Sequence, residues 1–333
     1  MQRRLLIMFI SFLLLVAGKE LKAQDPHFSQ FYANPIYLNP AFAGTNICPR
    51  FTLGFRDQWP SIPGSFITYS AAYDQHFDAI AGGIGALFFG DRQGQGYINT
   101  YSAHVMYSFR LKVCREFQMR FALQAGYQTR SIDWNKLTFG DMIDPRFGFV
   151  YPTAETPPDH LQTHAFDLAA GFIGYTEYLY FGMAAHHLTM PYEGFKSDIS
   201  RLPIRWTGHV GAYIDLKRKS KKERSFGDIS ISPNVIYQQQ STLHYLNTGF
   251  YLNFYPFTVG VWMRNSFVKE DPIDAVVFMC GVQFEMIRVG YSYDITVGKN
   301  ASTTGGAHEV TVQILLPCPE KVRKIKDLNC PDF

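Results

Sequence analysis

The sequence has few charged side chains, and no long apolar run follows its first two dozen residues. Charged residues make up 18% of the chain, against about 25% in an average soluble protein. Beyond residue 23 no continuous apolar stretch approaches the roughly 20 residues of a membrane-spanning helix. The formal net charge of +3 is too small to indicate a nucleic-acid partner. A typical soluble protein and a helical membrane protein are therefore both disfavoured.

Cysteine is also sparse and scattered. Five cysteines are spread over 333 residues, which excludes a zinc knuckle and a dense disulfide framework. Cys318 and Cys330 flank a short tail and could pair in an oxidising compartment, although two free thiols are an equally good interpretation.

The motifs of hydrolytic and metal chemistry are absent too. The sequence contains no Gly-x-Ser-x-Gly elbow and no His-Glu-x-x-His helix. His186 and His187 are adjacent, so in a strand they are expected on opposite faces and cannot share a metal. We predict no catalytic residues, no cofactor and no metal site.

The first 23 residues have the layout of a secretory signal peptide. Arg3 and Arg4 precede an apolar run at 5–18, and Ala23 supplies the small residue before the expected cleavage. The apolar run is shorter than a spanning helix. We therefore expect an exported protein that is cut after Ala23.

Aromatic residues are abundant, at 16% of the chain, and many of them alternate with polar residues. Phe121, Leu123 and Tyr127 alternate with Arg120 and Gln124, for example. An alternation of period two predicts strands with one apolar and one polar face. Runs of about ten such residues have the length that crosses a membrane when the strand is tilted.

Turn residues between these runs divide the chain into fourteen predicted strands. Their ranges are 50–57, 65–75, 80–91, 97–110, 116–130, 164–174, 178–188, 204–216, 226–239, 241–254, 257–267, 273–283, 284–296 and 305–316. The sequence thus predicts an all-β fold, a transmembrane antiparallel β-barrel of the outer membrane. A large soluble β-sandwich is the structural alternative, because it would alternate as well.

Loop lengths predict the orientation of this barrel. Outer-membrane barrels have short periplasmic turns and longer outer loops, and the longest predicted connections, 131–163 and 189–203, fall on the same side. The other side carries short turns, apart from the basic run at 217–224. We therefore expect the start of the barrel in the periplasm.

Some predicted strands carry charged residues on their polar face. In a barrel these would line a channel, anchor a plug, or be tolerated by a wet lumen; they are Arg120, Asp167, Arg264, Arg288, Asp294 and Glu309.

The segment at 24–45 is dense in aromatics and contains two Asn-Pro pairs, which favour a bent, extended path. We expect a plug or an arm that lines the lumen, or else an irregular turn leading into the barrel. Its most distinctive residues are Phe28, Gln30, Tyr32, Asn34, Pro35, Leu38, Asn39, Pro40 and Gly44.

This segment closely resembles the opening signature of the PorP/SprF family of the type IX secretion and gliding machinery. The sequence at 55–60, which contains Arg56, Gln58 and Trp59, is similar to a second family element, and His308-Glu309-Val310 to the opening of the last strand. The resemblance spans 24–316. It implies a non-enzymatic outer-membrane protein that retains a large surface adhesin through the cargo's C-terminal domain, or that links the translocon to periplasmic or lipoprotein components.

The domain organisation follows as a signal peptide at 1–23, a signature segment at 24–49, a barrel at 50–316 and a periplasmic tail at 317–333. Aromatic residues of the outer loops are the candidate contacts for a partner, namely Trp59, Phe139, Phe147, Tyr151, Tyr192 and Phe195. Basic residues are the candidate periplasmic contacts, namely Lys217, Arg218, Lys219, Lys321, Arg323 and Lys324. A substrate-specific channel is the alternative from another functional class.

Overall fold

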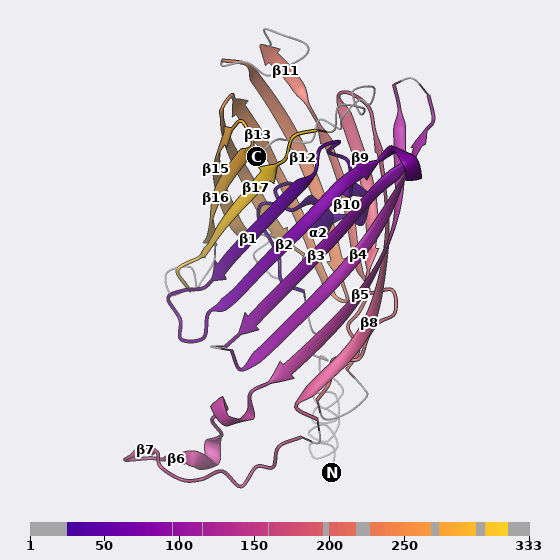
Figure 1. Ribbon diagram of the computed structural model, residues 1–333. Coiled ribbons are helices and arrows are strands. Elements are labelled where there is room, and N and C mark those ends of the chain that lie inside the picture. The colour runs from indigo at the N-terminus through magenta and orange to yellow at the C-terminus, as the bar shows by residue number, and fades with distance from the viewer. Residues whose placement is uncertain are drawn as a thin grey trace, which may run out of the picture.

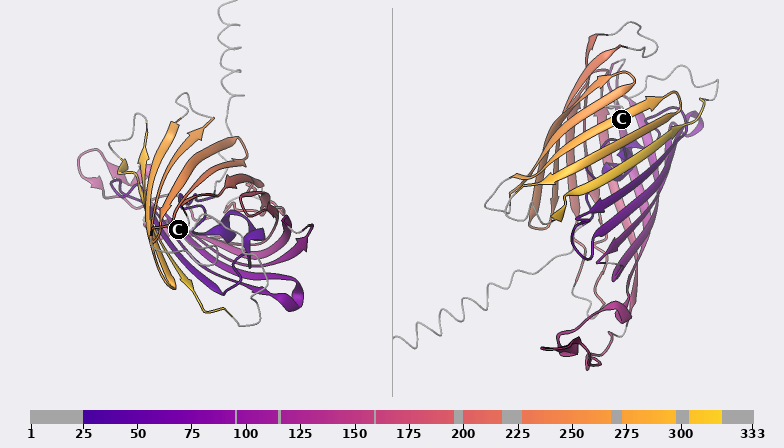
Figure 2. Two further views of the ribbon diagram at one scale, coloured as in Figure 1. Left: turned by 90° about the horizontal axis from the view of Figure 1, so that it is seen from above. Right: turned by 90° about the vertical axis from the view of Figure 1, so that its left-hand side faces the viewer.

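The computed structural model is a closed antiparallel β-barrel (Figures 1 and 2). It describes residues 25–318 except 95, 115, 159, 196–199, 218–226, 268–272 and 298–303, so the predicted signal peptide at 1–23 lies outside the described residues. The wall strands are β1 (Arg50–Gln58), β2 (Phe66–Phe77), β3 (Gly82–Gln93), β4 (Ile98–Lys112), β5 (Gln118–Ile132), β8 (Gln162–Tyr175), β9 (Leu179–His186), β10 (Arg205–Ala212), β11 (Ile214–Lys217), β12 (Ile229–Gln240), β13 (Leu243–Phe254), β14 (Phe257–Ser266), β15 (Ile273–Phe284), β16 (Ile287–Thr296) and β17 (Ala307–Leu315).

The sheet contains fifteen hydrogen-bonded strands in the described residues, and its ends meet. β10 and β11 both pair with β12 and are separated only by Tyr213, so they form one interrupted strand. Fifteen less one gives the fourteen strands that the sequence predicted. The first strand pairs with the last, Arg50 opposite Leu315 and Gln58 opposite Ala307, and β10 pairs with β12. The predicted outer-membrane barrel is confirmed.

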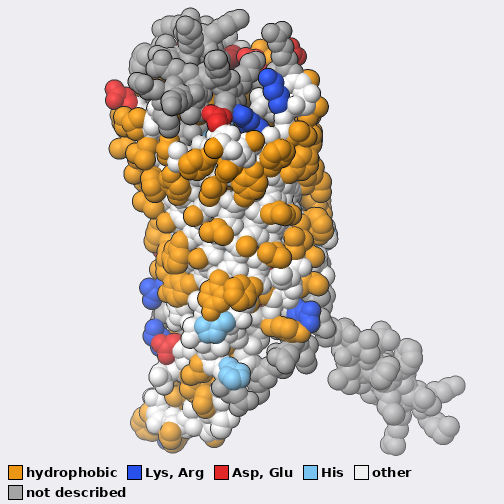
Figure 3. All heavy atoms as spheres, turned by 45° about the vertical axis from the view of Figure 1, so that its right-hand side comes forward, with side chains coloured by type: hydrophobic (Ala, Val, Ile, Leu, Met, Phe, Trp, Pro, Cys, Tyr) orange, Lys and Arg blue, Asp and Glu red, His pale blue; other side chains and the backbone are white. Residues whose placement is uncertain are grey.

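The wall has its apolar side outward. On β5, Leu123 is 71% exposed and Phe121 is also exposed, whereas Arg120 and Gln124 are buried inside. Figure 3 shows apolar side chains covering much of the outer wall. This is the expected arrangement when lipid replaces water around a barrel, and it explains why an alternating sequence has so few charged residues.

The two ends of the barrel differ. What we call the short-turn end carries the start of β1, the end of β17 and the connections 78–81, 113–117, 176–178, 255–256 and 285–286. The long-loop end carries the connections 133–161 and 187–204, together with 59–65, 94–97 and 241–242. The loop at 133–161 contains η3 (Trp134–Lys136), η4 (Gly140–Met142) and a hairpin of β6 (Ile143–Asp144) and β7 (Gly148–Phe149) that projects from the barrel (Figure 1).

Residues 25–48, which we call the luminal segment, lie inside the ring of strands (Figure 2, left). They contain α2 (Pro35–Leu38) and η1 (Pro40–Phe42). Proline begins both short helices, where its missing N–H costs nothing, and the Asn39 side chain caps η1 by accepting from the Ala41 N–H at 2.9 Å. No helix among the described residues has the length and apolarity to cross a bilayer.

A disulfide joins the luminal segment to the end of the barrel. Cys48 lies just before β1 and bonds to Cys318, which follows β17, with the two Cα atoms 4.6 Å apart. Cys318 therefore does not pair with Cys330, the partner considered from the sequence. Barrel closure is the physical reason, because the pairing of β1 with β17 brings these two chain positions together.

Candidate functional site in the lumen and at the long-loop end

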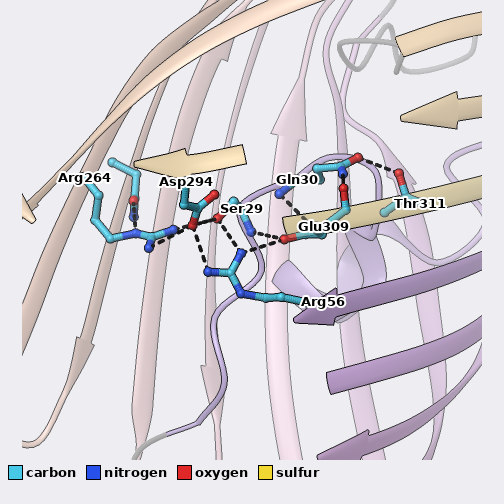
Figure 4. A network of polar contacts seen from close by, with 8 residues as sticks. Ser29, Gln30, Arg56, Arg264, Asp294, Glu309 and Thr311 are labelled. Carbon is cyan, nitrogen blue, oxygen red and sulfur yellow. Dashed lines mark hydrogen bonds and ion pairs between the residues drawn. The ribbon is translucent and has the colours of Figure 1, made fainter. Parts of the chain in front are cut away.

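A buried polar network holds the luminal segment to the wall at Ser29 and Gln30 (Figure 4). The Glu309 carboxylate of β17 accepts from the backbone N–H groups of Ser29 at 2.7 Å and Gln30 at 3.1 Å. The Gln30 side chain donates to the Glu309 carbonyl at 3.0 Å and accepts from the Thr311 hydroxyl. Two consecutive residues of the segment are thus fixed by one strand.

Two arginines complete the network. Arg56 Nη2 lies 2.8 Å from Asp294 and its Nη1 lies 3.0 Å from Glu309, all three side chains being buried. The Ser29 hydroxyl donates to Asp294 and accepts from Arg56 at 2.8 Å and from Arg264 at 2.9 Å. Because two carboxylates face two guanidinium groups, these buried charges are compensated in pairs. The predicted inward charges Arg264, Asp294 and Glu309 therefore contact the segment.

The middle of the luminal segment is held through backbone groups. Asn39 Nδ2 donates to the carbonyls of Phe172 at 3.0 Å and Met183 at 3.1 Å. The Gln313 side chain donates to the Ala33 carbonyl at 2.6 Å. Backbone carbonyls of the wall thus accept from a side chain of the segment, and an inward side chain of the wall supplies a partner for a backbone carbonyl of the segment.

The last part of the segment is held in the same way. Arg120 donates to the Ala43 carbonyl at 3.1 Å, and Asp74 accepts from the Gly44 N–H at 2.9 Å while forming an ion pair with Arg50 at 2.9 Å. Gly44, with φ of +65°, lies against Gly83 of β3, and a Cβ on either residue would meet the other's backbone. The segment and the wall therefore fit too closely here for a larger side chain.

An aromatic cluster lies beside these contacts. The Tyr32 ring is edge-on to Tyr180 at 5.7 Å and to Tyr251 at 6.2 Å, and Phe31 lies 5.0 Å from Trp262. All the signature residues singled out in the sequence are buried, namely Phe28, Gln30, Tyr32, Asn34, Pro35, Leu38, Asn39, Pro40 and Gly44. The signature is thus a set of contacts with the barrel interior.

At the long-loop end, Asp25 lies among three wall residues. Its carboxylate is 2.7 Å from His187 and 3.1 Å from Arg205, and Asp167 is 2.9 Å from the other ring nitrogen of His187. The expectation that His186 and His187 point to opposite faces is wrong. His187 has a positive φ of 60° just after β9 ends, so the strand alternation no longer applies and both rings are buried.

A cavity of about 150 Å³ lies between this part of the segment and the wall. Tyr37 and Phe89 line it together with Gln124, Arg130 and Glu193. Glu193 belongs to the β9–β10 connection and is hydrogen-bonded to Gln128 at 2.8 Å and to Arg130 at 2.6 Å. Burial raises the pKa of Glu193, although Arg130 opposes that shift. The connection is therefore held to β5 beside the cavity.

The loop candidates separate into two groups. Phe139, Phe147 and Tyr151 belong to the projecting loop at 133–161, where Phe147 is 76% exposed and Tyr151 is also exposed. Asp144 fixes the loop by accepting from the Arg146 N–H at 2.7 Å, from the Phe147 N–H at 3.0 Å and from the Tyr151 hydroxyl at 3.0 Å. Hydrogen bonding to its charged form lowers the pKa of Asp144.

The second group of loop candidates consists of Tyr192, Phe195 and Trp59, which lie against the barrel. The guanidinium of Arg201 stacks 4.4 Å from the Tyr192 ring, and that of Arg130 lies 5.9 Å from the Phe195 ring. Trp59 packs edge-on against Phe66 at 5.5 Å, next to the start of β2. Tyr192 is 44% exposed, whereas Phe147 and Tyr151 are 76% and 53% exposed, so the projecting loop offers the more exposed apolar surface.

Of the basic candidates, Lys217 ends β11 at the short-turn end and is exposed. The remaining five, Arg218, Lys219, Lys321, Arg323 and Lys324, lie outside the described residues. Within the described ranges, no group of three or more His, Cys, Asp and Glu residues is arranged to hold a metal ion.

Sequence comparison gives a family. The model for "Type IX secretion system membrane protein PorP/SprF" matches residues 20–314. No curated protein matches the sequence.

Among solved structures, the chain is similar to the CymD monoaromatic hydrocarbon channel, with 8% identity, 85% of this chain and 93% of that chain covered, and a TM-score of 0.47. It is also similar to the P. putida toluene transporter TodX, with 9% identity, coverage of 83% and 90%, and a TM-score of 0.44. A third is the Acinetobacter baumannii outer membrane protein Omp33, with 8% identity, coverage of 81% and 99%, and a TM-score of 0.41. Such distant matches carry no argument about function.

Proposed function

The chain belongs to the PorP/SprF family of type IX secretion system membrane proteins, and from this premise we propose that it anchors, or helps to secrete, a large cell-surface adhesin by binding the cargo's C-terminal domain without catalysis. The observation that carries the proposal is the contrast between a lumen occupied by residues 25–48 and an apolar loop tip that is exposed at the long-loop end. The protein is an outer-membrane barrel, and the contrast favours contact with a partner over transport through the lumen.

The proposal places the long-loop end outside the cell. Long outer loops and short periplasmic turns are the usual arrangement of such barrels. The start of β1 and the end of β17 share the short-turn end with the Cys48–Cys318 disulfide, which an oxidising periplasm would maintain. A barrel domain at 50–316, a preceding segment at 24–49 and a periplasmic tail at 317–333 fit this orientation.

The proposal also makes the luminal segment a plug. Hydrogen bonds hold it at three levels, through Asp25 at the long-loop end, Ser29 and Gln30 further in, and Gly44 towards the short-turn end. Rings such as Tyr32 and Phe31 fill the space between these levels. A segment held in this way would prevent a wide aqueous path.

The loop at 133–161 supplies the contact surface. Four large apolar side chains are exposed in its hairpin and just after it, namely Phe147, Phe149, Val150 and Tyr151. Exposed apolar clusters mark interaction sites, and the few residues that dominate binding at protein interfaces are enriched in Trp, Tyr and Arg. The carboxylates of Asp141 and Asp144 accept hydrogen bonds from backbone N–H groups of the loop, and this ordering lowers the entropy cost of binding.

A combined replacement tests this function. Phe139, Phe147, Tyr151, Tyr192 and Phe195 are changed together to Ala, and the proteins of the culture medium are compared with those of the cell surface. We expect the barrel to insert and one surface protein to move into the medium. Phe257→Ala, an exposed aromatic at the short-turn end, is the matched control and should change nothing. Unchanged retention in the loop variant would refute the anchoring role.

A core translocon component is the second candidate. In that role the basic positions, of which Lys217 is the described one, would contact periplasmic or lipoprotein partners. Loss of the gene would then block every type IX cargo, whereas an adhesin anchor would affect one. Secretome profiling of the deletion strain separates the two.

A substrate-specific channel is the third candidate, and the cavity of about 150 Å³ beside Tyr37 and Phe89 is the observation that favours it. The plug predicts no conductance of the intact protein in planar bilayers, and conductance when residues 24–45 are deleted. An open intact barrel would support the channel.

A further inference from the structure

Three tyrosine–histidine pairs recur on the outer wall with nearly the same geometry. The hydroxyl–Nδ1 distance is 2.7 Å for Tyr127 and His164, 2.8 Å for Tyr237 and His244, and 2.8 Å for Tyr291 and His308. Their ring centroids lie 5.9, 6.3 and 6.2 Å apart, with interplanar angles of 18°, 33° and 35°. We call these three pairs the rim dyads.

The strand register is the same in all three. His164 is opposite Thr129, His244 is opposite Gln239, and His308 is opposite Tyr293. Each of these opposing residues stands two positions after the tyrosine of its dyad, so every dyad is a diagonal pair on one face of two neighbouring strands. Aromatic side chains reach one another across such diagonals.

All rim dyads are at the long-loop end. His164, His244 and His308 stand within the first three residues of β8, β13 and β17, at the ends where the long-loop connections enter these strands. Two strands, β9 and β10, lie between the first dyad and the second, and two strands, β14 and β15, lie between the second and the third. The dyads therefore occur at regular intervals along more than half of the ring.

The first dyad lies at the loop-side boundary of the apolar wall. The residue two positions after each histidine, towards the middle of the wall, is Phe166, Leu246 or Val310. Beyond the first dyad, towards the loops, the Gln162 side chain donates to the Thr129 hydroxyl at 2.8 Å. A change from apolar to polar side chains on a lipid-facing surface locates the membrane interface. The first dyad thus lies at the depth of lipid headgroups, and the other two have the same register near the long-loop ends of their strands.

The dyad geometry also orients a hydrogen-bond donor. When the tyrosine hydroxyl donates to Nδ1, the neutral imidazole carries its proton on Nε2. That N–H is on the side of the ring away from the tyrosine. A hydrogen bond from it to an ionised acceptor is roughly twice as strong as one to a neutral group.

We propose that the rim dyads bind the phosphate groups of outer-leaflet lipid A, with the histidine Nε2–H as donor and the tyrosine as the group that fixes the tautomer and ring orientation. The proposal rests on the orientation given under Proposed function and is independent of any cargo. It explains why the same diagonal pair of tyrosine and histidine recurs near the long-loop end, where strand pairing alone would be satisfied by other aromatic residues.

The test uses the purified, folded barrel in detergent and measures its thermal unfolding midpoint while lipid A is added. Fully phosphorylated lipid A should raise the midpoint of the wild type more than dephosphorylated lipid A does. Replacing His164, His244 and His308 together by Phe keeps the rings but removes the donors, so the difference between the two lipids should disappear. The affinity of each altered site for phosphorylated lipid A should fall about tenfold, the value of one hydrogen bond to a charged group.

The matched control replaces Phe51, Phe257 and Phe284, exposed aromatics at the short-turn end, by Leu and should keep the full difference. If the triple histidine variant does not fold, single variants are measured, because each leaves two dyads intact. A wild-type protein that responds equally to both lipids would overturn the proposal. So would a histidine variant that keeps the wild-type difference, since the dyads would then serve only to pair strands.

Discussion

Glu309 is the residue whose change should loosen the luminal segment most. Its buried carboxylate accepts from two backbone N–H groups of the segment, at 2.7 and 3.1 Å, and lies 3.0 Å from Arg56. The amide of Glu309→Gln has a single oxygen, so it can accept from only one of these donors at full strength. One N–H then loses its partner, and Arg56 keeps Asp294 but loses its second carboxylate.

The expected cost follows from these two losses. An orphaned buried donor costs about 1–3 kcal/mol, and a hydrogen bond to a charged group contributes about 1.5–3 kcal/mol. Since Gln retains the size of Glu and one acceptor, we expect the free energy of unfolding to fall by about 3 kcal/mol. Val310→Ala, the outward neighbour on the same strand, should cost about 1 kcal/mol for its lost methyl groups.

The assay is equilibrium unfolding of both variants in urea, with limited proteolysis near residue 29 as a second readout. Glu309→Gln should unfold at a lower urea concentration than Val310→Ala and should be cleaved in the segment before the barrel unfolds. Equal midpoints and equal protection of the segment would refute the argument that this network fixes it.

Three further changes follow from the structure. Cys48→Ser, or reduction, should lower stability by about 2–4 kcal/mol and slow migration on a non-reducing gel, whereas replacing the unpaired Cys114 should do neither. Gly83→Ala should lower the free energy of unfolding in urea by about 1–3 kcal/mol, because the added methyl group meets the Ala43 carbonyl. The control Gly208→Ala should leave it unchanged, because a Cβ at this position meets nothing within 4 Å. The pKa of Asp144 is lowered from 3.8 by hydrogen bonds from the Arg146 N–H group, the Tyr151 hydroxyl and the Phe147 N–H group, so its contribution to the loop is present above pH 3.8 and lost as the pH falls below it. Trp134 fluorescence should change there in the wild type and change less in Asp144→Asn, in which the Asp141 contacts remain to be lost.

The wall was predictable because its pattern is local. Leu123 and Phe121 alternate with Gln124 and Arg120, and this alternation alone fixes a strand and its two faces. The break at Tyr213, which separates β10 from β11, has no such signal and was missed. Strand ends shifted by only a few residues because turn residues mark them.

The lumen was less predictable because its contacts are remote in sequence. Ser29 and Asp294 are 265 residues apart, and Gln30 and Thr311 are 281 apart, so the sequence indicated inward charges without their partners. Arg56 could have been predicted as an inward charge, because it lies on the polar face of β1. The Cys48–Cys318 bond was also accessible, because closing a barrel places the residue before the first strand beside the residue after the last.

Site-specific photocross-linking at Phe147 in living cells tests the central claim most directly. The account predicts that a probe at this exposed loop tip captures the C-terminal domain of an exported surface protein, while the same probe at Phe257, at the short-turn end, does not. Capture of the same protein at both positions, or at Phe257 alone, would contradict it.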